Sequence, residues 1–388
     1  MALYKFKLPK FSELSDDQKV AVNTPESIAL TGGPGTGKSV VSVWRHIYNL
    51  TDLEKKSLLL TYTKTLQQAL NLITDSAIKD KEKELGRKLN ISPNVKRTQK
   101  TEYNISDLDV FDEIIIDEAQ DNPCSFYELL KDHADSICYG ADNTQILYPD
   151  RACNNECFQN KHSDLTYNID SIKKVKESCL FDIFSNNEPV ALFRNYRNTY
   201  EVMCFVRSLF PERNVISFAA LQELKGPGEF ERRGPKPVYH ITERNSYNEE
   251  INRYEYSNQQ QDSFIKDIIE EYHADGHNIV ILVPFQNEVD YFFQKVESFD
   301  FTCSMFSANM EVIDDIQNIH ITTLKSAKGL EFDTVIIPNF QKIKENLTRF
   351  NIEENDYYVA VTRAKRNLYL IASSTISHLD SNTFTKEG

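Results

Sequence analysis

Hydrophobic positions along this chain follow two alternating patterns. Short continuous apolar runs, typical of strands buried on both faces of a parallel sheet, alternate with longer segments whose apolar residues recur at helical spacing. The runs predict strands at 28–31, 57–61, 111–116, 136–140, 188–193, 238–242, 278–283, 301–306, 319–323, 334–338 and 368–372. The periodic segments predict helices at 17–23, 40–50, 64–75, 170–176, 260–273, 287–296 and 354–365.

Strands alternate with helices in both halves of the chain, which predicts an α/β fold of two parallel-sheet domains. A length of 388 residues allows two or three domains. We expect the first domain at 1–187, with 149–187 as a small insertion or linker, and the second at 188–388, with 211–260 as a reduced insertion. The glycine- and proline-rich stretch 226–237 is expected to be an exposed loop.

A glycine-rich stretch joins the first predicted strand to the helix at 40–50. It fits the pattern G-x-x-x-x-G-K-[ST] between Gly32 and Ser39, in the strand-then-helix context that a phosphate-binding loop needs. Glycine allows positive φ and close approach of the backbone to an anion at the positive end of a helix dipole. Lys38 would reach the β- and γ-phosphates, and the Ser39 hydroxyl would bind Mg²⁺. The stretch therefore predicts nucleoside triphosphate binding by Gly32, Gly33, Pro34, Gly35, Thr36, Gly37, Lys38 and Ser39.

Two adjacent carboxylates, Asp117 and Glu118, directly follow the apolar strand at 111–116. At the carboxyl end of a parallel strand they would face the crevice in which α/β proteins bind phosphates. One carboxylate can hold Mg²⁺ and the other can activate the attacking water. An Asp-Glu pair after a strand can also be a helix cap, but the phosphate loop upstream favours the catalytic interpretation. Gln145, after the strand at 136–140, either contacts the γ-phosphate or closes a turn.

Composition narrows the class of protein. Hydrophobic residues make up 40% and charged residues 26%, as is usual for globular proteins. Seven cysteines in so long a chain favour a reducing, cytoplasmic setting; Cys153, Cys157 and Cys179 match no standard zinc spacing, which favours free thiols over a metal site. No signal peptide or membrane span is expected. A net charge of −14 restricts any nucleic-acid contact to a local, salt-sensitive patch.

The order of these motifs resembles the superfamily 1 DNA helicases and translocases of the UvrD/Rep-like branch, from Gln18 to Lys365. The resemblance implies two RecA-like domains with an ATP site in the crevice between them. It implies that Gln18 reads adenine, and that Thr61 and Tyr62, in Thr-Tyr-Thr-Lys, grip single-stranded DNA. Asp117-Glu118-Ala-Gln-Asp resembles the Mg²⁺ and water-activating element, and Asp142 with Gln145 resembles the motif that links ATP to DNA.

The resemblance continues in the second half of the chain. Asn195-Tyr196-Arg197 is similar to the element whose Tyr stacks on adenine and whose Arg touches the γ-phosphate. Thr-Thr-Leu-Lys-Ser-Ala-Lys-Gly-Leu-Glu-Phe, from 322 to 332, contains Lys325 where the family usually has His, and implies that Glu331 belongs to the nucleotide site. Tyr-Val-Ala-Val-Thr-Arg-Ala-Lys, from 358 to 365, is similar to the motif whose Arg, here Arg363, is the arginine finger.

Three departures from the family affect the function that the resemblance implies. Lys325 could replace the usual His as a phosphate contact, and no Trp that stacks on a base follows Tyr148. The sole Trp, Trp44, is expected in the core. The gaps between the motifs leave little room for the large insertions of strongly unwinding members, so the motor is retained and the strand-separating equipment is reduced.

The resemblance implies an ATP-dependent, Mg²⁺-dependent translocase or helicase that acts on single-stranded DNA, with RNA as the alternative substrate and 3′→5′ movement as the suspected polarity. Glu118 would activate water, while Lys38, Arg197 and Arg363 would stabilise the transition state and Gln145 would sense the γ-phosphate. Two alternatives stay open. One is a nucleic-acid-gated ATPase switch that regulates a partner such as a nuclease in a defence or repair complex. The other is a P-loop NTPase unrelated to nucleic acid.

Overall fold

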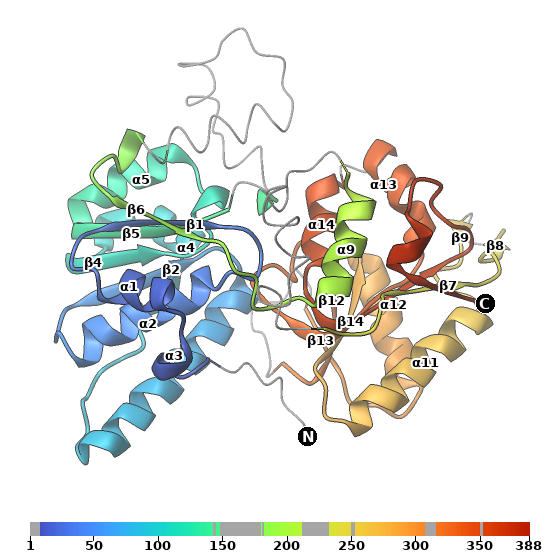
Figure 1. Cartoon of the computed structure of the whole chain (residues 1–388), viewed down its shortest axis with the longest axis horizontal. Helices are drawn as coiled ribbons and strands as arrows, with labels where there is room; N and C mark the ends of the chain where they lie inside the picture. Colours follow the sequence, from blue (N-terminus) through green and yellow to red (C-terminus); the bar gives the residue numbers. More distant parts are fainter. Residues whose placement is uncertain are drawn as a thin grey trace, which may run out of the picture. The chain divides into compact units, whose positions relative to one another are not determined.

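The computed structural model describes residues 8–142, 145–147, 180, 182–211, 233–249, 253–306, 316–349 and 352–388. The chain divides into two compact units, with Phe6–Asn195 forming one and Tyr196–Gly388 the body of the other (Figure 1). Both units are α/β, as predicted. The predicted helix at 170–176 lies outside the described residues.

The first unit is built on a six-stranded parallel sheet of order β3-β2-β4-β5-β1-β6. Each strand is short and runs in the same direction because helices or turns return the chain between strands. The strands are β1 (Ile28–Gly32), β2 (Ser57–Thr61), β3 (Val95–Arg97), β4 (Phe111–Ile116), β5 (Ala134–Ala141) and β6 (Glu188–Leu192). The helices are α1 (Asp16–Asn23), α2 (Lys38–Thr51), α3 (Lys64–Leu85), α4 (Thr98–Tyr103) and α5 (Cys124–Leu130).

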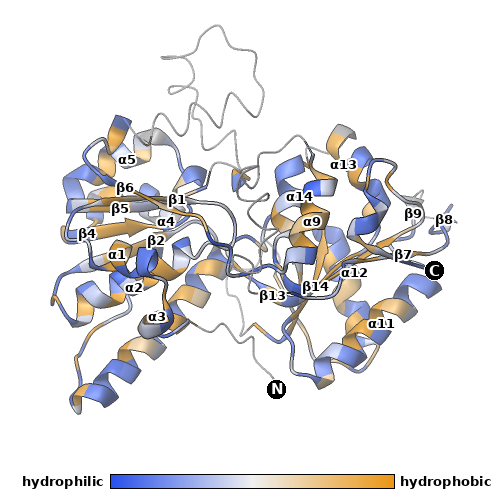
Figure 2. Ribbon diagram, viewed as in Figure 1, coloured by the Kyte–Doolittle hydropathy of each residue, from blue (hydrophilic) through white to orange (hydrophobic). Residues whose placement is uncertain are grey.

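Alternate strand residues of this sheet enter two separate cores, one on each face. Leu59 and Ile115 pack with α2 and α3, whereas their neighbours Leu58 and Ile114 pack on the opposite face with Tyr127 of α5. Successive side chains of a strand point to opposite faces, so a sheet covered on both sides needs apolar residues at nearly every position. Figure 2 shows these strands as hydrophobic between helices whose outer faces are polar. This burial explains why the strands could be predicted from continuous apolar runs.

The predicted domain boundary was placed too early in the chain. Strand β6 pairs in parallel with β1, from Ile28–Glu188 to Gly32–Leu192, and therefore completes the first sheet instead of opening the second. Asn187 reinforces this position, because its amide donates hydrogen bonds to the carbonyls of Ile28 and Ile137. The division between the units falls after Asn195, eight residues later than the predicted end at 187 (195 − 187 = 8).

The second unit contains a seven-stranded parallel sheet of order β11-β12-β10-β13-β14-β7-β15. Its strands are β7 (Val238–Ile241), β10 (Ile279–Val283), β11 (Ser304–Met305), β12 (Ile319–Thr323), β13 (Phe332–Ile337), β14 (Ala364–Ala372) and β15 (Thr385–Glu387). Its helices are α9 (Tyr200–Leu209), α11 (Gln259–Ala274), α12 (Gln286–Glu297), α13 (Ile343–Arg349) and α14 (Glu354–Val361). A two-stranded antiparallel ribbon joins β8 (Tyr247–Asn248) to β9 (Arg253–Tyr254).

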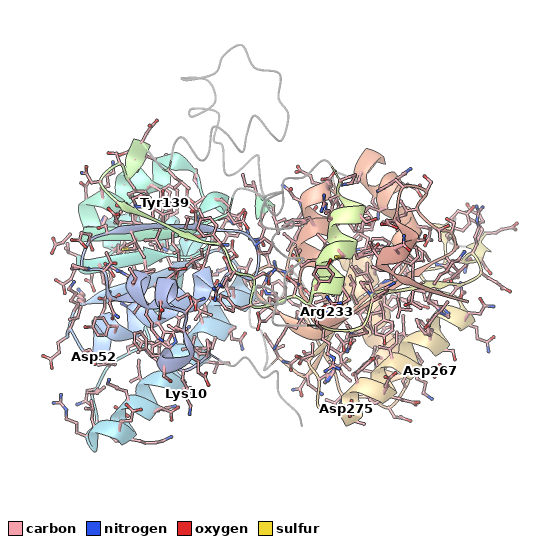
Figure 3. The ribbon with its side chains drawn as sticks, viewed as in Figure 1. Lys10, Asp52, Tyr139, Arg233, Asp267 and Asp275 are labelled. Carbon is pink, nitrogen blue, oxygen red and sulfur yellow. The ribbon has the colours of Figure 1, made fainter. Side chains whose placement is uncertain are left out.

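The covering helices of this unit follow from their amphipathic sequences. On α11, Ile265, Ile268 and Ile269 are buried against the sheet, while Asp267 is exposed on the outer side (Figure 3). Strand β7 lies between β14 and β15 in the sheet. The range 211–260 therefore cannot be an insertion as a whole, because it contains a strand of the core sheet.

Candidate nucleotide site and associated residues

Four neighbouring strands of the first sheet bring the predicted site residues to one edge. Strands β2, β4, β5 and β1 are adjacent and parallel, so their carboxyl ends lie side by side. These ends lead into Tyr62, Asp117, Asp142 and the glycine loop respectively. The carboxyl edge of such a sheet is where α/β proteins bind their ligands. Motifs that lie far apart in the sequence, such as the glycine loop and Asp142, therefore belong to one region.

The glycine loop has the backbone geometry that phosphate binding requires. Gly35 and Gly37 have φ of 73° and 91°, values that L side chains rarely adopt, and Gly37 is the residue before α2. A Cβ on Gly32 would lie 2.6 Å from the carbonyl oxygen of Leu192 and 2.7 Å from Thr36 Oγ1. Loop amides at the start of a 14-residue helix are the donors that an anion site needs.

Lys38, the first residue of α2, is 8% exposed and turns back over the loop. Its Nζ donates hydrogen bonds to the carbonyls of Gly32 at 2.7 Å and Gly33 at 3.0 Å. The same ammonium lies 3.7 Å from the Asp142 carboxylate. The lysine is thus held directly beside the loop where the β- and γ-phosphates would sit.

A chain of side-chain contacts connects this lysine to the predicted base. The Gln145 amide donates to the Asp142 carboxylate. The backbone N–H of Asp142 donates to Gln120 Oε1 at 3.1 Å, and Gln120 Nε2 donates to Glu118 Oε2 at 2.5 Å. Each of these side chains is at most 8% exposed. Sequence reasoning missed Gln120 as a site residue; its place between Glu118 and Asp121 in the motif was the only available signal.

Glu118 sits in a left-handed conformation with φ of 58°. A non-glycine residue in that region is uncommon and is a feature of functional turns. The turn follows β4 directly, and Ala119 within it accepts a hydrogen bond from the buried Tyr127 hydroxyl. The tertiary packing therefore holds the backbone that aims Glu118.

Asp117 fits the role of an Mg²⁺ ligand together with Ser39. Its side chain is 1% exposed, and a Cβ on Gly140 would lie 3.7 Å from both Asp117 Oδ1 and Lys38 Cβ. Asp117 and Lys38 therefore both lie beside Gly140 at the carboxyl end of β5. Carboxylate and hydroxyl oxygens are the ligand types that Mg²⁺ prefers, with phosphate oxygens and water completing the octahedron. Within the described ranges, no group of three or more His, Cys, Asp or Glu side chains forms a separate metal site.

Gln18 supports the loop from α1. Its side-chain amide donates to the Thr36 carbonyl at 3.1 Å, and its Oε1 accepts from the backbone N–H of Ser15 at 3.1 Å. Gln18 also lies against Gly37, where a Cβ would collide with its amide nitrogen. The residue predicted to read adenine is therefore beside the phosphate loop, and in this structure its amide is engaged within the protein.

Arg45 and Glu113 form a buried pair that orients the elements around the loop. Arg45 donates to both Glu113 oxygens at 3.0 and 2.8 Å and also to the carbonyls of Ala21 and Thr24 at the end of α1. Although burial opposes ionisation of Glu113, the Arg45 guanidinium holds the pKa of Glu113 below its ordinary value. The pair joins α1 and α2, which carry Gln18 and Lys38, to β4, which Asp117 directly follows. No sequence signal linked two residues 68 positions apart.

Thr61 and Tyr62, the predicted nucleic-acid residues of this unit, are buried at the end of β2. Thr61 is fully buried, and its hydroxyl has no hydrogen-bond partner among the described residues. Tyr62 is 5% exposed. A base can stack on the Tyr62 ring only after the surrounding side chains move.

In the second unit, Arg197 and Glu331 form an ion pair, with Nε 3.1 Å from Oε2. Burial opposes ionisation of Glu331, yet Arg197, Lys365 and Arg363 hold its pKa below the ordinary value. The neighbouring Tyr196 is 38% exposed. The Tyr-Arg motif thus consists of one partly exposed ring, Tyr196, and one arginine, Arg197, that is paired with a carboxylate.

Arg363 has different surroundings from Arg197. It is 1% exposed and donates to the carbonyls of Val359 and Leu330 and to the Thr362 hydroxyl, at 2.9, 3.3 and 3.3 Å. Asn198, which follows Arg197, donates to the carbonyls of Thr362 and Ala364 on either side of Arg363. The two predicted arginines are therefore supported by one connected set of residues.

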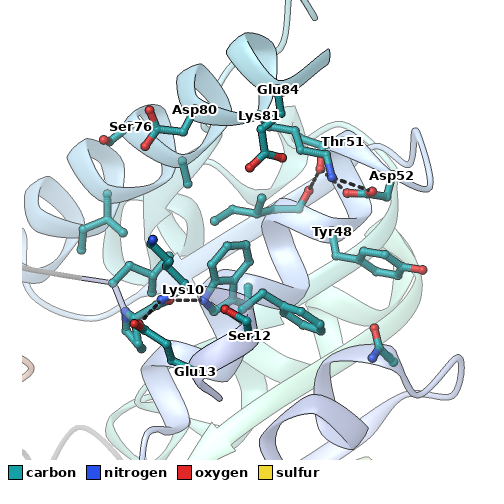
Figure 4. Close-up of a pocket in the computed structure, with 18 residues that line it drawn as sticks. Lys10, Ser12, Glu13, Tyr48, Thr51, Asp52, Ser76, Asp80, Lys81 and Glu84 are labelled. Carbon is teal, nitrogen blue, oxygen red and sulfur yellow. Dashed lines mark hydrogen bonds and ion pairs between the residues drawn. The ribbon is translucent and has the colours of Figure 1, made fainter.

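A hollow of about 930 Å³ lies in the first unit between the N-terminal segment, α2 and α3 (Figure 4). Trp44 packs on Phe11 with ring centroids 5.7 Å apart and donates to the Pro9 carbonyl, so it belongs to the core edge as predicted. Lys81 and Asp52 form an ion pair across the rim at 3.0 Å. No residue of the glycine loop lines this hollow. It is separate from the nucleotide site.

The cysteines with predicted free thiols at 153, 157 and 179 lie outside the described residues. Among those described, Cys138, Cys204 and Cys303 are free. Every helix in the described part of the chain is too short or too polar to span a lipid bilayer.

Two family descriptions match the chain. The UvrD-like helicase C-terminal domain matches residues 238–375, and an AAA domain matches residues 18–148. The RecBCD enzyme subunit RecB of Chlamydia pneumoniae is 43% identical over 61 residues, which are 16% of this chain and 6% of that protein. The same subunit of Chlamydia muridarum (strain MoPn / Nigg) is 41% identical over 69 residues, which are 18% of this chain and 6% of that protein. The chain thus aligns with a small part of the length of these relatives.

Solved structures show weaker likenesses. The C-terminal domain of a possible DNA helicase from Lactobacillus plantarum WCFS1 has a TM-score of 0.33 and 17% identity, over 50% of this chain and 99% of that one. The helicase nonstructural protein 10 of Arterivirus has a TM-score of 0.39 and 12% identity, over 92% of this chain and 61% of that one. Since both TM-scores are low, the fold description rests on the two sheets themselves.

Proposed function

The chain belongs to the UvrD-like superfamily 1 helicases, and from this premise we propose that it is an ATP-dependent motor that acts on single-stranded nucleic acid. The observation that supports this most directly is the shared edge of the first sheet. There, Lys38, Asp117 and Glu118 lie beside Asp142 and Gln145, a cluster suited to bind and cut a triphosphate.

In the proposed reaction, Lys38 and the loop amides bind the β- and γ-phosphates. Glu118 accepts a proton from the attacking water, and Gln120 keeps its carboxylate in place. ATP bound with Mg²⁺ supplies the phosphoryl group, with Ser39 and Asp117 as the residues that hold the ion. Arg197 and Arg363 stabilise the charge that develops on the γ-phosphate. Gln145 contacts the γ-phosphate and, through its hydrogen bond, Asp142.

DNA is proposed as the natural strand, with 3′→5′ movement, on the motif sequences alone. Thr61, Tyr62 and Lys325 are the proposed contacts, and RNA is the alternative substrate. Stacking of one base on an aromatic ring contributes roughly 1–3 kcal/mol. The burial of Tyr62 makes opening of that site part of the proposal.

A nucleic-acid-gated switch that regulates a protein partner is the second candidate. It is supported by the matches to RecB, named as a subunit of the RecBCD enzyme, and by the acidic net charge of −14. In this case ATP hydrolysis would change the partner's activity without movement along a strand.

Steady-state ATP hydrolysis, measured with oligo(dT), duplex DNA and RNA across a salt series, tests the proposal. Stimulation by one single strand that declines with salt supports it, because phosphate contacts release counterions. Translocation and strand-displacement assays then separate the motor from the switch. Hydrolysis that no nucleic acid changes at low salt would favour a P-loop NTPase of another class.

A further inference from the structure

Lys325 and Arg363 lie at opposite ends of the strands of the second sheet. Lys325 follows the carboxyl end of β12, whereas Arg363 directly precedes the amino end of β14. Because all strands of this sheet are parallel, these ends are separated by the length of the strands. A signal from a phosphate at Lys325 to Arg363 therefore needs an element that crosses between these ends.

Helix α14 is such an element. Asp356 is in its first turn, and Arg363 follows its last residue, Val361, by two positions. Arg363 Nε donates to the Val359 carbonyl within the helix, and Nη1 donates to Leu330 in the segment that leads from Lys325 to β13. Eight helical residues span roughly 12 Å. Displacement of α14 along its axis would therefore move the arginine.

Asp356 lies at the Lys325 end of this helix and has unusual surroundings. Its side chain is fully buried, and Oδ2 lies 3.6 Å from Lys325 Nζ and accepts from the Glu353 backbone N–H at 2.9 Å. The other oxygen, Oδ1, is buried without a hydrogen-bond partner among the described residues. Burial raises the pKa of Asp356 to about 6, and Lys325 opposes that rise.

Lys325 has access to solvent that Asp356 lacks. The lysine side chain is 31% exposed, so a phosphate can approach its ammonium from outside. If Lys325 moves away, Asp356 is left as a buried charge without its counter-ion, which is costly. Lys325, in contrast, can be solvated by water. Phosphate and Asp356 would then compete for the same ammonium.

We propose that Lys325 and Asp356 form a relay, in which a nucleic-acid phosphate draws Lys325 away from Asp356 and the loss of this contact shifts α14 together with Arg363. The relay rests on the proposed function and names the residue that connects its nucleic-acid contact to its arginine. Asp356 is a positioning residue, since it acts on the reaction only through α14.

The test compares wild type with Asp356→Asn, Lys325→Met and the double variant. Affinity for oligo(dT) is measured by fluorescence anisotropy, and the ratio of stimulated to basal kcat by ATP hydrolysis. Asn keeps an oxygen that accepts the Glu353 N–H, so the helix cap survives. Asp356→Asn should tighten oligo(dT) binding about two- to fivefold, the effect of removing a partly exposed ion pair, and should lower the stimulation ratio. Lys325→Met should weaken oligo(dT) binding. It should also reduce the slope of log K against log salt concentration by about 1, because one phosphate contact is lost.

In the Lys325→Met background, Asp356→Asn should no longer change oligo(dT) affinity, because the competition has been removed. Glu270→Gln is the matched control, since it removes an exposed ion pair with Lys266 in the same unit; its binding and stimulation ratio should equal those of wild type. The relay would be overturned if nucleic acid stimulated the wild type normally and Asp356→Asn changed neither oligo(dT) affinity nor the stimulation ratio. The proposed function would remain in that case. An equal effect of Asp356→Asn in both backgrounds would also overturn it. A wild-type protein that ignores nucleic acid would overturn both proposals.

Discussion

The two units present their predicted site residues in different ways. In the first unit, Lys38, Asp142 and Glu118 gather at the carboxyl ends of adjacent strands and contact one another through short side-chain bridges. In the second unit, Arg363 is buried at an amino end and Arg197 is held by Glu331. The first arrangement brings the residues of the candidate nucleotide site together. The second is a pair of arginines whose charges are held within the protein.

The difference follows from the chemistry of each group. A phosphate loop works through backbone amides and glycine φ values, which a local sequence can specify. An arginine has five N–H donors and needs acceptors from several elements when it is buried. Arg363 takes these acceptors from α14 and from the segment after β12, so the position of its guanidinium depends on the positions of both elements.

The largest expected effects concern the two arginines. Arg197→Ala and Arg363→Ala should each reduce kcat by about 10³-fold or more, the usual contribution of an arginine finger. Their stabilities should differ: Arg363→Ala removes a large buried side chain together with its hydrogen bonds to Val359, Leu330 and Thr362, and should lower the free energy of unfolding by roughly 2–4 kcal/mol. Arg197→Ala removes the partly exposed ion pair with Glu331 and should cost less than about 1 kcal/mol. Urea unfolding and steady-state kinetics measure the two effects.

Arg363→Lys separates the roles of that arginine, because it keeps the positive charge but lacks the planar guanidinium whose three nitrogens donate to Val359, Leu330 and Thr362 in different directions. Normal kcat in an unstable Arg363→Ala protein would mean that Arg363 is only a structural residue. The contrast between the units would then reduce to one catalytic unit and one scaffold.

Glu118 and Lys38 of the first unit should have different effects on hydrolysis and on nucleotide binding. Glu118→Gln should lower kcat about 10²- to 10⁴-fold, because the general base is removed, while ATP affinity stays near wild type. Lys38→Ala should lose hydrolysis and weaken binding as well. A fluorescent ATP analogue and steady-state kinetics report the two quantities. If Glu118→Gln retained hydrolysis, another group would have to be the base; Glu84→Gln, on the rim of the separate hollow, is the control.

A buried carboxylate in the second unit should make its stability depend on pH. Burial raises the pKa of Glu288 in α12 to about 7, against the opposing charge of Lys342. Between its ordinary pKa and pH 7 the folded protein binds more protons than the unfolded chain, so this group's contribution to stability falls as pH rises. Glu288→Gln should therefore be more stable than wild type at pH 8, by up to about 3 kcal/mol, and should lose that advantage near pH 4.

Thermal unfolding across this pH range measures the Glu288 effect, with the exposed Glu270→Gln as control. Equal pH profiles for wild type and Glu288→Gln would show that Glu288 titrates normally. The first unit offers a matching contrast, since Arg45 lowers the pKa of the buried Glu113. The stability that this lowered pKa contributes is present above the ordinary pKa of a glutamate and is lost only as the pH falls through the pKa of Glu113 in the folded protein.

The smallest expected effect concerns Tyr62. Tyr62→Phe keeps the ring and should change oligo(dT) affinity by less than about twofold, whereas Tyr62→Ala removes the stacking surface and should weaken binding by roughly 1–3 kcal/mol. Because Tyr62 is 5% exposed, Tyr62→Ala should also lower the melting temperature. If its basal hydrolysis fell as much as its stimulated hydrolysis, Tyr62 would be a core residue and would not contact nucleic acid.

Local patterns in the sequence determined much of this protein. Apolar runs predicted most strands because the sheets are covered on both faces. Gly32–Ser39 and Asp117-Glu118 could be named as candidate nucleotide residues because both are contiguous motifs at strand ends. The helix at 64–75 and the strand at 301–306 were predicted with the wrong lengths: α3 continues to Leu85, and β11 is limited to Ser304–Met305. Element ends depend on neighbours that no short window contains.

Only the tertiary structure decided the pairings between distant residues. It placed β6 beside β1 and so moved the end of the first unit to Asn195. It joined Arg45 to Glu113, Arg363 to Leu330 and Lys325 to Asp356. The physical reason is common to all of these. A buried charge needs an oppositely charged or hydrogen-bonding partner, and the edge of a strand needs another strand to pair with. These partners lie close in the folded protein but can be far apart in sequence.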